Sequence, residues 1–190
     1  MAYFATNTAT THQLYLNVWE VVQEIEERGF LIDYVMMDGG SANRAFMSML
    51  FTDDPRKEGF STPNIFDFSR SVSIVQDIKH CFKKIRNGLE NSRQANRGTK
   101  SRFLVCNGHC IIWEHFEAAY EFNTQSGLRL HRHLTKEHIF LTPANKMRNN
   151  LATQVLDHDM LYLMKAYQAT QESPEQLSST IGLLKHTSTL

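Results

Sequence analysis

A short, mostly apolar segment followed by an acid and two glycines constrains the fold of this chain most strongly. Residues 31–37 (LIDYVMM) lie between Gly29 and the run Asp38-Gly39-Gly40, which predicts a buried β-strand that stops abruptly. Apolar residues recur every three or four positions across residues 12–28, and this spacing predicts an amphipathic helix before the strand. Helix, short loop, strand and a carboxylate at the carboxyl end of the strand form an α/β pattern.

The remaining periodicities predict one more strand and then mainly helices. Residues 71–75 (SVSIV) are the second strand candidate, and Asp77 follows this strand much as Asp38 follows the first. The further predicted elements are a helix at 41–50 with Ser41 as N-cap, a surface loop at 52–64, a helix at 78–89, a hairpin at 102–113, a helix at 114–122 and one long helix at 142–169. The Ser/Thr-rich residues 171–190 are expected to form a disordered tail.

Composition and charge bound the class of protein. Of the 190 residues, 42% are hydrophobic and 21% are charged, so the chain can bury a core in one domain or in two small ones. The formal net charge is zero, which argues against a dedicated nucleic-acid module. A local basic tract nevertheless spans residues 79–102, with eight Lys and Arg residues against one acid. This tract fits a solvated helix face and a contact with a phosphate backbone equally well.

Cysteine usage and hydropathy indicate the compartment. Cys81, Cys106 and Cys110 are an odd number without the spacing of a structural zinc site, so we expect buried, reduced thiols. The chain opens without a basic and apolar leader, and no apolar run approaches the roughly 18 residues that span a bilayer. We therefore expect a soluble intracellular protein, in the cytosol or the nucleus, without a membrane partner.

Asp38 is the strongest candidate for chemistry. A carboxylate at the carboxyl end of a buried strand lies where open α/β sheets bind ligands, and Gly39 and Gly40 let the chain turn away from it. Mg²⁺ prefers carboxylate, water and phosphate oxygens, so this position suits a metal-dependent phosphoryl-transfer site. The alternative is that Asp38 only caps the turn that follows.

Three further groups of residues carry weaker signals. Asp77 precedes a helix rich in cations, where it could hold a phosphate–metal pair or act as a plain N-cap. The histidines at 131, 133 and 138 lack a cysteine or acid at a metal-site interval, so a loop without metal is favoured. Residues 145–148 (NKMR) begin like the Asn-Lys-x-Asp guanine-reading motif, but Arg148 replaces its essential acid. The sequence lacks a Gly-x-x-x-x-Gly-Lys-Ser/Thr loop, which excludes a P-loop GTPase.

Four segments, taken together and in this order, resemble P-element-type (THAP-domain) DNA transposases. The segments are MDGGSANRAF (37–46), DIKHCFKKIRN (77–87), CIIWEHFEAAYEF (110–122) and LTKEHIFLTPANKMRNNLATQVL (134–156). They match the family patterns Asp-Gly-x-Ser-x-Asn-Arg, Asp-x-x-His-x-x-Lys-x-x-Arg-Asn, and Leu-Thr-x-x-His-Ile followed by Lys-Met-Arg and Leu-Ala-x-Gln-Val. The resemblance covers roughly residues 12–165.

The resemblance implies a metal-dependent cut-and-paste DNA transposase, in which a mostly helical GTP-binding domain is inserted into an RNase H-like domain. By similarity, Asp38 matches the second catalytic, metal-binding carboxylate of the family. Asp77 and Lys83 match the segment where the insertion begins and where the nucleotide is contacted. The other residues of that motif are His80, Arg86 and Asn87. The cofactors expected from the resemblance are GTP and Mg²⁺; the expected partners are DNA, another copy of the chain or an intact transposase; and the expected location is the nucleus.

The chain also departs from the family pattern in ways that bear on activity. The family's first catalytic acid precedes the position of residue 12, its final glutamate follows the insertion, and its zinc-binding THAP domain has no counterpart in this sequence. Two-metal phosphoryl transfer requires several carboxylates, and Asp38 alone cannot assemble such a site. We therefore expect that the chain does not cleave DNA by itself.

The expected architecture runs from α/β to mainly α. Residues 1–70 are expected to form the end of a partial RNase H-like sheet, residues 71–170 part of a GTP-binding insertion domain, and residues 171–190 the disordered tail. Missing strands are expected to leave an open sheet edge and exposed apolar surface. The expected function is that of a fragment or domesticated remnant of a transposase. The alternative is a regulatory or split-enzyme binding partner of an intact transposase.

Overall fold

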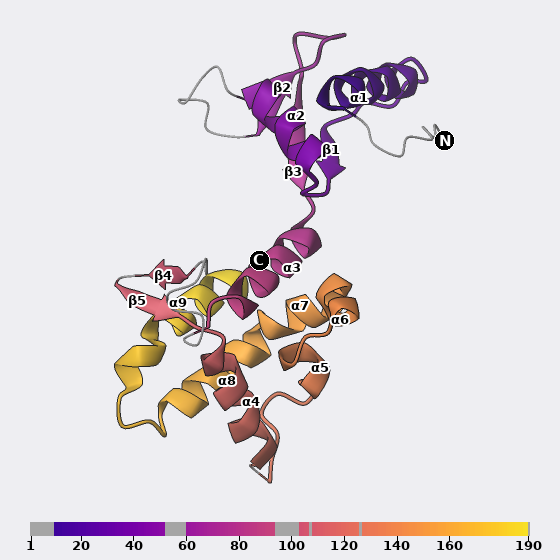
Figure 1. Cartoon of the computed structure of the whole chain (residues 1–190). Coiled ribbons are helices and arrows are strands. Elements are labelled where there is room, and N and C mark those ends of the chain that lie inside the picture. The colour runs from indigo at the N-terminus through magenta and orange to yellow at the C-terminus, as the bar shows by residue number, and fades with distance from the viewer. Residues whose placement is uncertain (1–9, 52–59, 94–102, 107, 126, 190) are drawn as a thin grey trace. The chain divides into compact units, whose positions relative to one another are not determined.

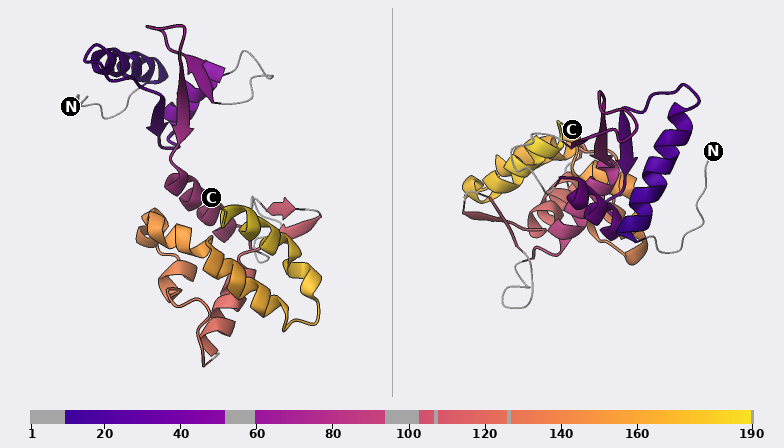
Figure 2. Two further views of the ribbon diagram at one scale, coloured as in Figure 1. Left: turned by 180° about the vertical axis from the view of Figure 1, so that it is seen from behind. Right: turned by 90° about the horizontal axis from the view of Figure 1, so that it is seen from above.

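Two compact units make up the chain, residues 1–80 and residues 81–190, and helix α3 (Ile78–Glu90) contributes residues to both. The computed structural model, drawn in Figures 1 and 2, describes residues 10–51, 60–93, 103–106, 108–125 and 127–189. The expected order of a small sheet followed by mainly helices is confirmed. The boundary expected after residue 70 lies earlier than the one observed, because residues 71–76 form a strand that pairs within the first unit.

The first unit is a three-stranded sheet with two helices packed on it (Figure 1). Its elements are α1 (Thr11–Glu26), β1 (Tyr34–Met37), α2 (Ser41–Phe51), β2 (Ser61–Pro63) and β3 (Ser71–Gln76). The strands lie in the order β1-β3-β2, with β1 parallel and β2 antiparallel to β3. Both helices and both strands predicted for this part of the sequence are confirmed, with bounds shifted by a few residues.

Alternation along the strands buries one face of this sheet and leaves the other exposed. The buried cluster consists of Trp19, Val22, Met37, Phe46, Val72 and Ile74. On the opposite face, Tyr34, Met36 and Val75 expose 62%, 59% and 41% of their surface, and Met36 is the register partner of Val75. We call these three residues the open sheet face. The exposed apolar surface expected from the sequence is therefore present.

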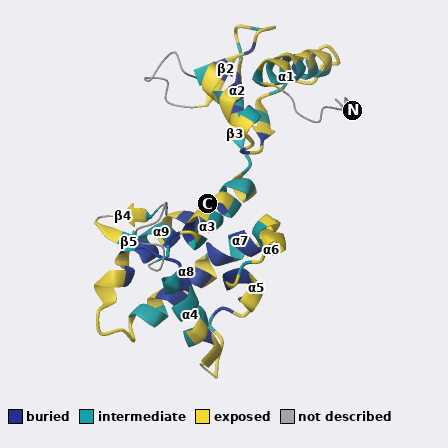
Figure 3. Cartoon of the chain, viewed as in Figure 1, coloured by how far each residue is buried: buried dark blue, intermediate teal, exposed yellow. Residues whose placement is uncertain are grey.

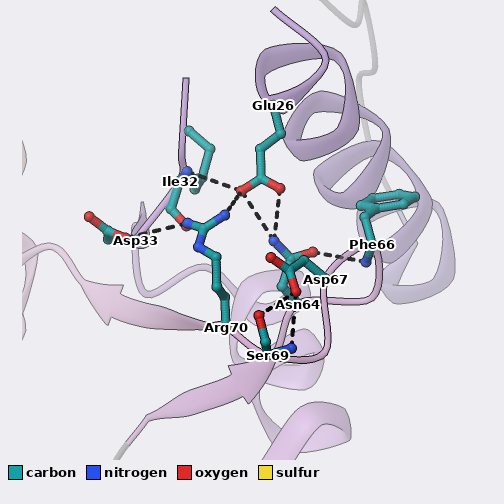
Figure 4. Close-up of polar contacts among 8 residues, drawn as sticks. All are labelled: Glu26, Ile32, Asp33, Asn64, Phe66, Asp67, Ser69 and Arg70. Atoms are coloured by element: carbon teal, nitrogen blue, oxygen red, sulfur yellow. Dashed lines mark hydrogen bonds and ion pairs between the residues drawn. The ribbon is translucent and has the colours of Figure 1, made fainter. Parts of the chain in front are cut away.

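A polar cluster ties the end of α1 to the loop between β2 and β3 (Figure 4). Oε1 of Glu26 accepts hydrogen bonds from Nη1 of Arg70 at 2.8 Å and from the backbone N–H of Ile32 at 3.1 Å. Nδ2 of the buried Asn64 donates to both Glu26 oxygens, and Nη2 of Arg70 donates to Ile32 O and Asp33 Oδ1. Burial alone would raise the pKa of Glu26, but the hydrogen bonds from Arg70, Ile32 and Asn64 outweigh burial and hold this pKa below its usual range. We call these five residues the Glu26 cluster.

The second unit is mainly helical and has one continuous core. Its elements after α3 are β4 (Leu104–Cys106), β5 (His109–Ile111), α4 (Glu114–Gln125), α5 (Lys136–Ile139), α6 (Pro143–Met147), α7 (Asn149–Val155), α8 (His158–Gln168), the 3₁₀ helix η2 (Pro174–Leu177) and α9 (Ser178–Thr187). Figure 3 shows buried positions along α7, α8 and α9. Trp113 and Phe116 stack in this core with ring centroids 5.1 Å apart, and Nε1 of Trp113 donates to the carbonyl of Ile139. The β4–β5 hairpin predicted around Gly108 is confirmed, although Asn107 lies outside the described residues.

The single long helix predicted at 142–169 is wrong, because the chain breaks there into α6, α7 and α8. Arg148 adopts an extended conformation (φ −83°, ψ 113°) between α6 and α7. Asp157 then caps α8, and its side chain accepts a hydrogen bond from the backbone N–H of Met160. A cap of this kind satisfies a helix N-terminus, so it competes with continuation of the preceding helix.

The prediction of a disordered tail at 171–190 is also wrong, since η2 and α9 occupy most of this segment. Leu177, Ile181 and Leu184 are spaced as one face of a helix, and all three are buried in the core. Buried hydroxyls in the segment are paired as well: Oγ of Ser179 donates to Cys106 O, and Oγ1 of Thr187 donates to Leu156 O. The Ser/Thr-rich composition indicated solvation, but these hydroxyls bond to backbone carbonyls instead.

None of the three cysteines forms a disulfide, but the expectation of buried thiols is wrong, because none of the three is fully buried. Cys106 is exposed, and Cys81 and Cys110 are half-buried. The physical reason for Cys106 is its place on β4, where all three residues are exposed. Among the described residues, no helix is long and apolar enough to cross a membrane.

Candidate functional site

Two acids from distant parts of the sequence meet at the carboxyl edge of the parallel strands. Met37 of β1 is the register partner of Gln76 of β3, and each is followed directly by an aspartate, Asp38 or Asp77. The backbone N–H of Asp77 donates to the carbonyl of Met37 at 2.8 Å, so the ladder extends to the acids themselves. This edge is where open α/β sheets bind ligands.

The Asp38 carboxylate is held by the turn that follows it. Its Oδ1 accepts hydrogen bonds from the backbone N–H of Gly40 and from Nδ2 of Asn43, each at 2.7 Å. A Cβ atom at Gly40 would lie 2.9 Å from this oxygen, so the close approach requires glycine. Asp38 is exposed and fixed in direction, which fits both interpretations from the sequence: a turn cap and an oriented ligand.

Asp77 directly precedes α3 and orients a histidine. Its Oδ1 accepts from the backbone N–H of Lys79 at 2.9 Å, and its Oδ2 lies 2.6 Å from Nδ1 of His80. The hydrogen bond from His80 is the main reason why the pKa of Asp77 is below its usual range. Since a carboxylate only accepts, Nδ1 of His80 carries the proton and Nε2 is directed away from Asp77. The structure therefore places Asp38, Asp77 and His80 in the first unit, around one sheet edge.

The donor set at this edge is too small for a complete metal site. Within the described part of the chain, no group of three or more His, Cys, Asp or Glu side chains is arranged to hold a metal ion. The chemistry of Asp38 and Asp77 suits Mg²⁺, but two carboxylates that already accept hydrogen bonds leave most of an octahedral shell to other groups. The catalytic and metal roles of Asp38 stay predictions.

The other three residues named from the sequence lie in the second unit, on α3. Lys83 is half-buried and makes no hydrogen bond or ion pair with the described residues. Arg86 is fully buried, and its Nη2 donates to the carbonyls of Asn145, Lys146 and Arg148 at 3.1, 3.4 and 3.5 Å. Nδ2 of Asn87 also donates to Lys146 O, at 3.1 Å. Arg86 and Asn87 therefore bind the carboxyl end of α6.

A cavity of about 670 Å³ opens between α4, α5 and α6 in the second unit. Its lining residues are Tyr120, Glu121, Lys136, Glu137, Phe140, Thr142 and Asn145. Two of them are aromatic rings in edge contact, with the Tyr120 and Phe140 centroids 6.2 Å apart. Sequence reasoning did not identify this cavity as a site, although its residues lie within two of the segments that resemble transposases. The cavity forms only where these two segments pack together in the fold. The spacing of residues within either segment does not reveal that contact.

The histidines at 131, 133 and 138 lie in different environments. His131 and His138 are buried, whereas His133 is exposed. Nε2 of His138 lies 2.7 Å from Oε1 of Gln154, and Nε2 of His131 lies 3.0 Å from the Gln154 carbonyl. Burial is the main reason why the pKa of His138 is below its usual value of 6.5. Both rings therefore pack inside the second unit and contact Gln154.

Comparison with known proteins places this fold. The sequence matches no protein-family model and no curated protein. Among solved structures, the chain is similar to a chain of the Drosophila P element transposase strand transfer complex, with a TM-score of 0.71 and 17% sequence identity. The match covers 90% of this chain and 36% of that chain. The chain therefore has the fold of a segment of a P element transposase and spans about a third of the length of that protein.

Proposed function

We propose that this chain is a transposase-derived segment, a fragment or domesticated remnant of a P element-like cut-and-paste DNA transposase, that does not cleave DNA alone. The observation that carries the proposal is the structural similarity over 90% of the chain. The four sequence segments that resemble the family support it independently, because they were identified without the fold. The proposed setting is the nucleus, with DNA as the partner of the larger assembly.

Asp38 and Asp77 define what this segment would contribute to DNA chemistry. In the proposal, Asp38 is one carboxylate ligand of Mg²⁺, and the fixed turn at Gly40 holds it in place. When bound, Mg²⁺ would supply charge stabilisation to a phosphoryl oxygen. Asp77 would hold His80 toward the same edge. Additional carboxylates would have to come from another segment or another chain, which is why cleavage by this chain alone is not expected.

The cavity of the second unit is the proposed site for a guanine nucleotide. Tyr120 and Phe140 offer apolar surfaces for a purine, and Lys136 offers a cation for a phosphate. The carboxylates of Glu121 and Glu137 are acceptors, which suit the N1–H and amino donors of guanine and do not suit the edge of adenine. Asp77 and Lys83, the residues that the resemblance assigns to the nucleotide, are not among the lining residues. The proposal therefore places the base in the cavity and leaves a role for Lys83 to experiment.

A thermal melt of the purified chain with Mg²⁺, alone and with excess GTP or ATP, tests nucleotide binding. A ligand that binds only the folded state adds about 2.7 kcal/mol of stability at a hundred times its dissociation constant. We expect GTP to raise the midpoint and ATP to leave it unchanged. Equal melts under all three conditions would contradict the nucleotide proposal.

Two matched lysine variants locate the phosphates. If the cavity holds the nucleotide, Lys136→Ala loses the GTP-induced shift and Lys83→Ala keeps it. If Lys83 contacts the phosphates, as the family resemblance implies, Lys83→Ala loses the GTP-induced shift and Lys136→Ala keeps it. Loss in both variants would indicate that both lysines contact the phosphates, and retention in both would contradict the two assignments.

A second candidate function is a regulatory or split-enzyme binding partner of an intact transposase. The open sheet face favours it, because Tyr34, Met36 and Val75 are exposed apolar side chains on one side of a small sheet. The test is reconstitution with the remaining transposase segments supplied in trans. Metal-dependent cleavage that appears with the wild-type chain and disappears with Asp38→Ala would support this role, whereas equal cleavage with both chains would contradict it.

A further inference from the structure

Helix α6 forms one wall of the cavity but contributes nothing to the core. It is five residues long, and none of its residues is buried. Thr142, its N-cap, and Asn145, in its middle, both line the cavity. Helices of this length are not stable by themselves in water. Something other than apolar packing must therefore hold this wall of the cavity in place.

Side chains of α3 supply that hold through polar contacts with the carboxyl end of α6. The last carbonyls of a helix have no partners within the helix, and a cation next to them is favourable. Nη2 of Arg86 donates to the carbonyls of Asn145, Lys146 and Arg148, and Nδ2 of Asn87 donates to that of Lys146. One turn further along α3, the carboxylate of Glu90 forms an ion pair with Nζ of Lys146 at 2.9 Å.

The burial of Arg86 is costly, which argues for a specific role. Its side chain is fully buried, and Nε and Nη1 have no hydrogen-bond partner among the described residues. A buried N–H group without a partner destabilises the folded state, so an apolar residue of similar volume would be the more stabilising choice for a position that only fills space. Burial also lowers the pKa of the guanidinium, although Glu90 opposes this. The contacts that Arg86 does make are those to α6.

We propose that Arg86 is a positioning residue for the cavity: it fixes the backbone of α6, and with it Thr142 and Asn145, without lining the cavity itself. The part of this inference that concerns ligand affinity rests on the proposed nucleotide function. Asn87 and Glu90 assist Arg86 from the same helix. The resemblance to transposases groups Arg86 and Asn87 with a nucleotide motif, and this geometry gives them an indirect part in binding.

Two readouts on the full chain test the inference. Arg86→Met removes the donor and keeps most of the side-chain volume, and Arg86→Lys keeps the charge with a single donor group. Arg132→Met is the matched control, because Arg132 is an exposed residue of a loop in the same unit. We expect amide hydrogen exchange at residues 144–148 to accelerate about tenfold or more in Arg86→Met, less in Arg86→Lys, and not at all in Arg132→Met. Asn87→Ala offers a second way to loosen α6 if Arg86→Met does not fold.

The second readout is the dissociation constant for GTP, measured by calorimetry. We expect it to rise about tenfold in Arg86→Met, with partial recovery in Arg86→Lys and no change in Arg132→Met. Unchanged exchange in α6 would overturn the inference, and so would faster exchange with unchanged GTP affinity. If the wild-type chain binds no nucleotide, the proposed nucleotide function is contradicted, whatever the exchange experiment shows. The positioning role of Arg86 is then tested by hydrogen exchange in α6 alone, and only faster exchange in Arg86→Met supports it.

Discussion

The two units of the chain are stabilised by different kinds of contact. Among the described residues, the first unit buries six hydrophobic side chains in its core and the second buries eighteen. The first unit compensates with the Glu26 cluster, in which one carboxylate joins the end of α1 to Asn64 and Arg70. The second has a continuous apolar core and also buries polar side chains, among them Arg86, Asn123 and His138. The unit that carries Asp38 is therefore the one with the smaller core.

This difference shows where the chain can tolerate change. A small core with a polar cluster depends on a few directional contacts, each of which can be removed by one substitution. A large core depends on volume, so its sensitivity is spread over many positions. The chain has two tryptophans, Trp19 in the first unit and Trp113 in the second. Fluorescence of Trp113→Phe and Trp19→Phe variants therefore reports on each unit separately.

The largest expected effect is in the core of the second unit. Phe116→Ala removes a fully buried ring stacked on Trp113 and should destabilise this unit by about 3–5 kcal/mol. Urea unfolding followed through Trp113 in a Trp19→Phe background measures it, with Phe116→Leu as the milder control. An unchanged midpoint for the first unit, followed through Trp19, would show that the units are energetically separate. A loss of stability in both units would show that they unfold together, and would contradict the view that each has its own core.

The next effect concerns the Glu26 cluster. Glu26→Ala strands Asn64 and Arg70 and should destabilise the first unit by about 2 kcal/mol, since hydrogen bonds to charged groups are among the stronger ones. Glu24→Ala is the matched control on the same helix, because Glu24 forms an exposed ion pair with Arg28. That pair should contribute less than about 1 kcal/mol. Equal losses of stability in the two variants would show that the Glu26 cluster contributes no more than an exposed ion pair.

Acidification should weaken the two units in different pH ranges. Burial lowers the pKa of His138 and of His115, so the folded state binds fewer protons than the unfolded state. The stability that the folded state gains from these two neutral imidazoles is complete above the ordinary pKa of 6.5. It is lost as the pH falls below that value, because protons then bind preferentially to the unfolded state. Glu26, whose ordinary value is 4.5, also has a lowered pKa, and its contribution is lost only below that value. Between these values, the second unit should lose stability while the first does not.

Urea midpoints of each unit at pH 7.5, 5.5 and 3.5 measure this separation. A His138→Gln variant keeps a hydrogen-bonding side chain without a titration near neutrality, and it should flatten the dependence of the second unit between the first two values. Asp157 acts in the opposite direction, because burial raises its pKa above 3.8 and this part of the stability is gained as pH falls. A first unit that weakens before the second would refute the assignment.

The smallest expected effect distinguishes two glycines. Gly40→Ala places a Cβ atom 2.9 Å from Oδ1 of Asp38 and should destabilise the first unit by about 1 kcal/mol. Gly88→Ala lies in the helical part of α3, where an added Cβ meets no atom within 4 Å, and should stabilise the second unit by about 0.5–1 kcal/mol. Opposite shifts in the thermal midpoints of the two variants are the expected result.

Sequence reasoning located elements whose pattern is local. The apolar spacing of α1, the run that became β1 and the acid after each parallel strand were all evident, because each depends on neighbours within a few residues. The resemblance to transposases led to the same fold that the structural comparison shows. What failed was composition used alone, as in the Ser/Thr-rich segment that forms α9.

The features that sequence reasoning missed depend on contacts between distant segments. The burial of Arg86 follows from carbonyls 59 to 62 positions away, which no window around α3 contains. The cavity requires Tyr120 and Phe140 to meet across α4 and α5. The breaks in the predicted long helix depend on side-chain caps such as that of Asp157, which compete with a helical spacing that continues through them.

The parallel pairing of β1 with β3 has a consequence for how the chain is made. Tyr34 pairs with Ser73, so 39 positions separate the partners, and no part of this ladder can form until β3 has left the ribosome. During that interval α1, β1 and α2 exist without the strand that completes their core, although the residues nearest the amino terminus are synthesised first. The second unit depends on still longer separations, because α9 contacts β5 and Oγ of Ser179 donates to Cys106 O, 73 positions away. The first unit can therefore complete its sheet while the second is still being synthesised, and the unit that carries Asp38 needs protection from aggregation only until β3 has emerged.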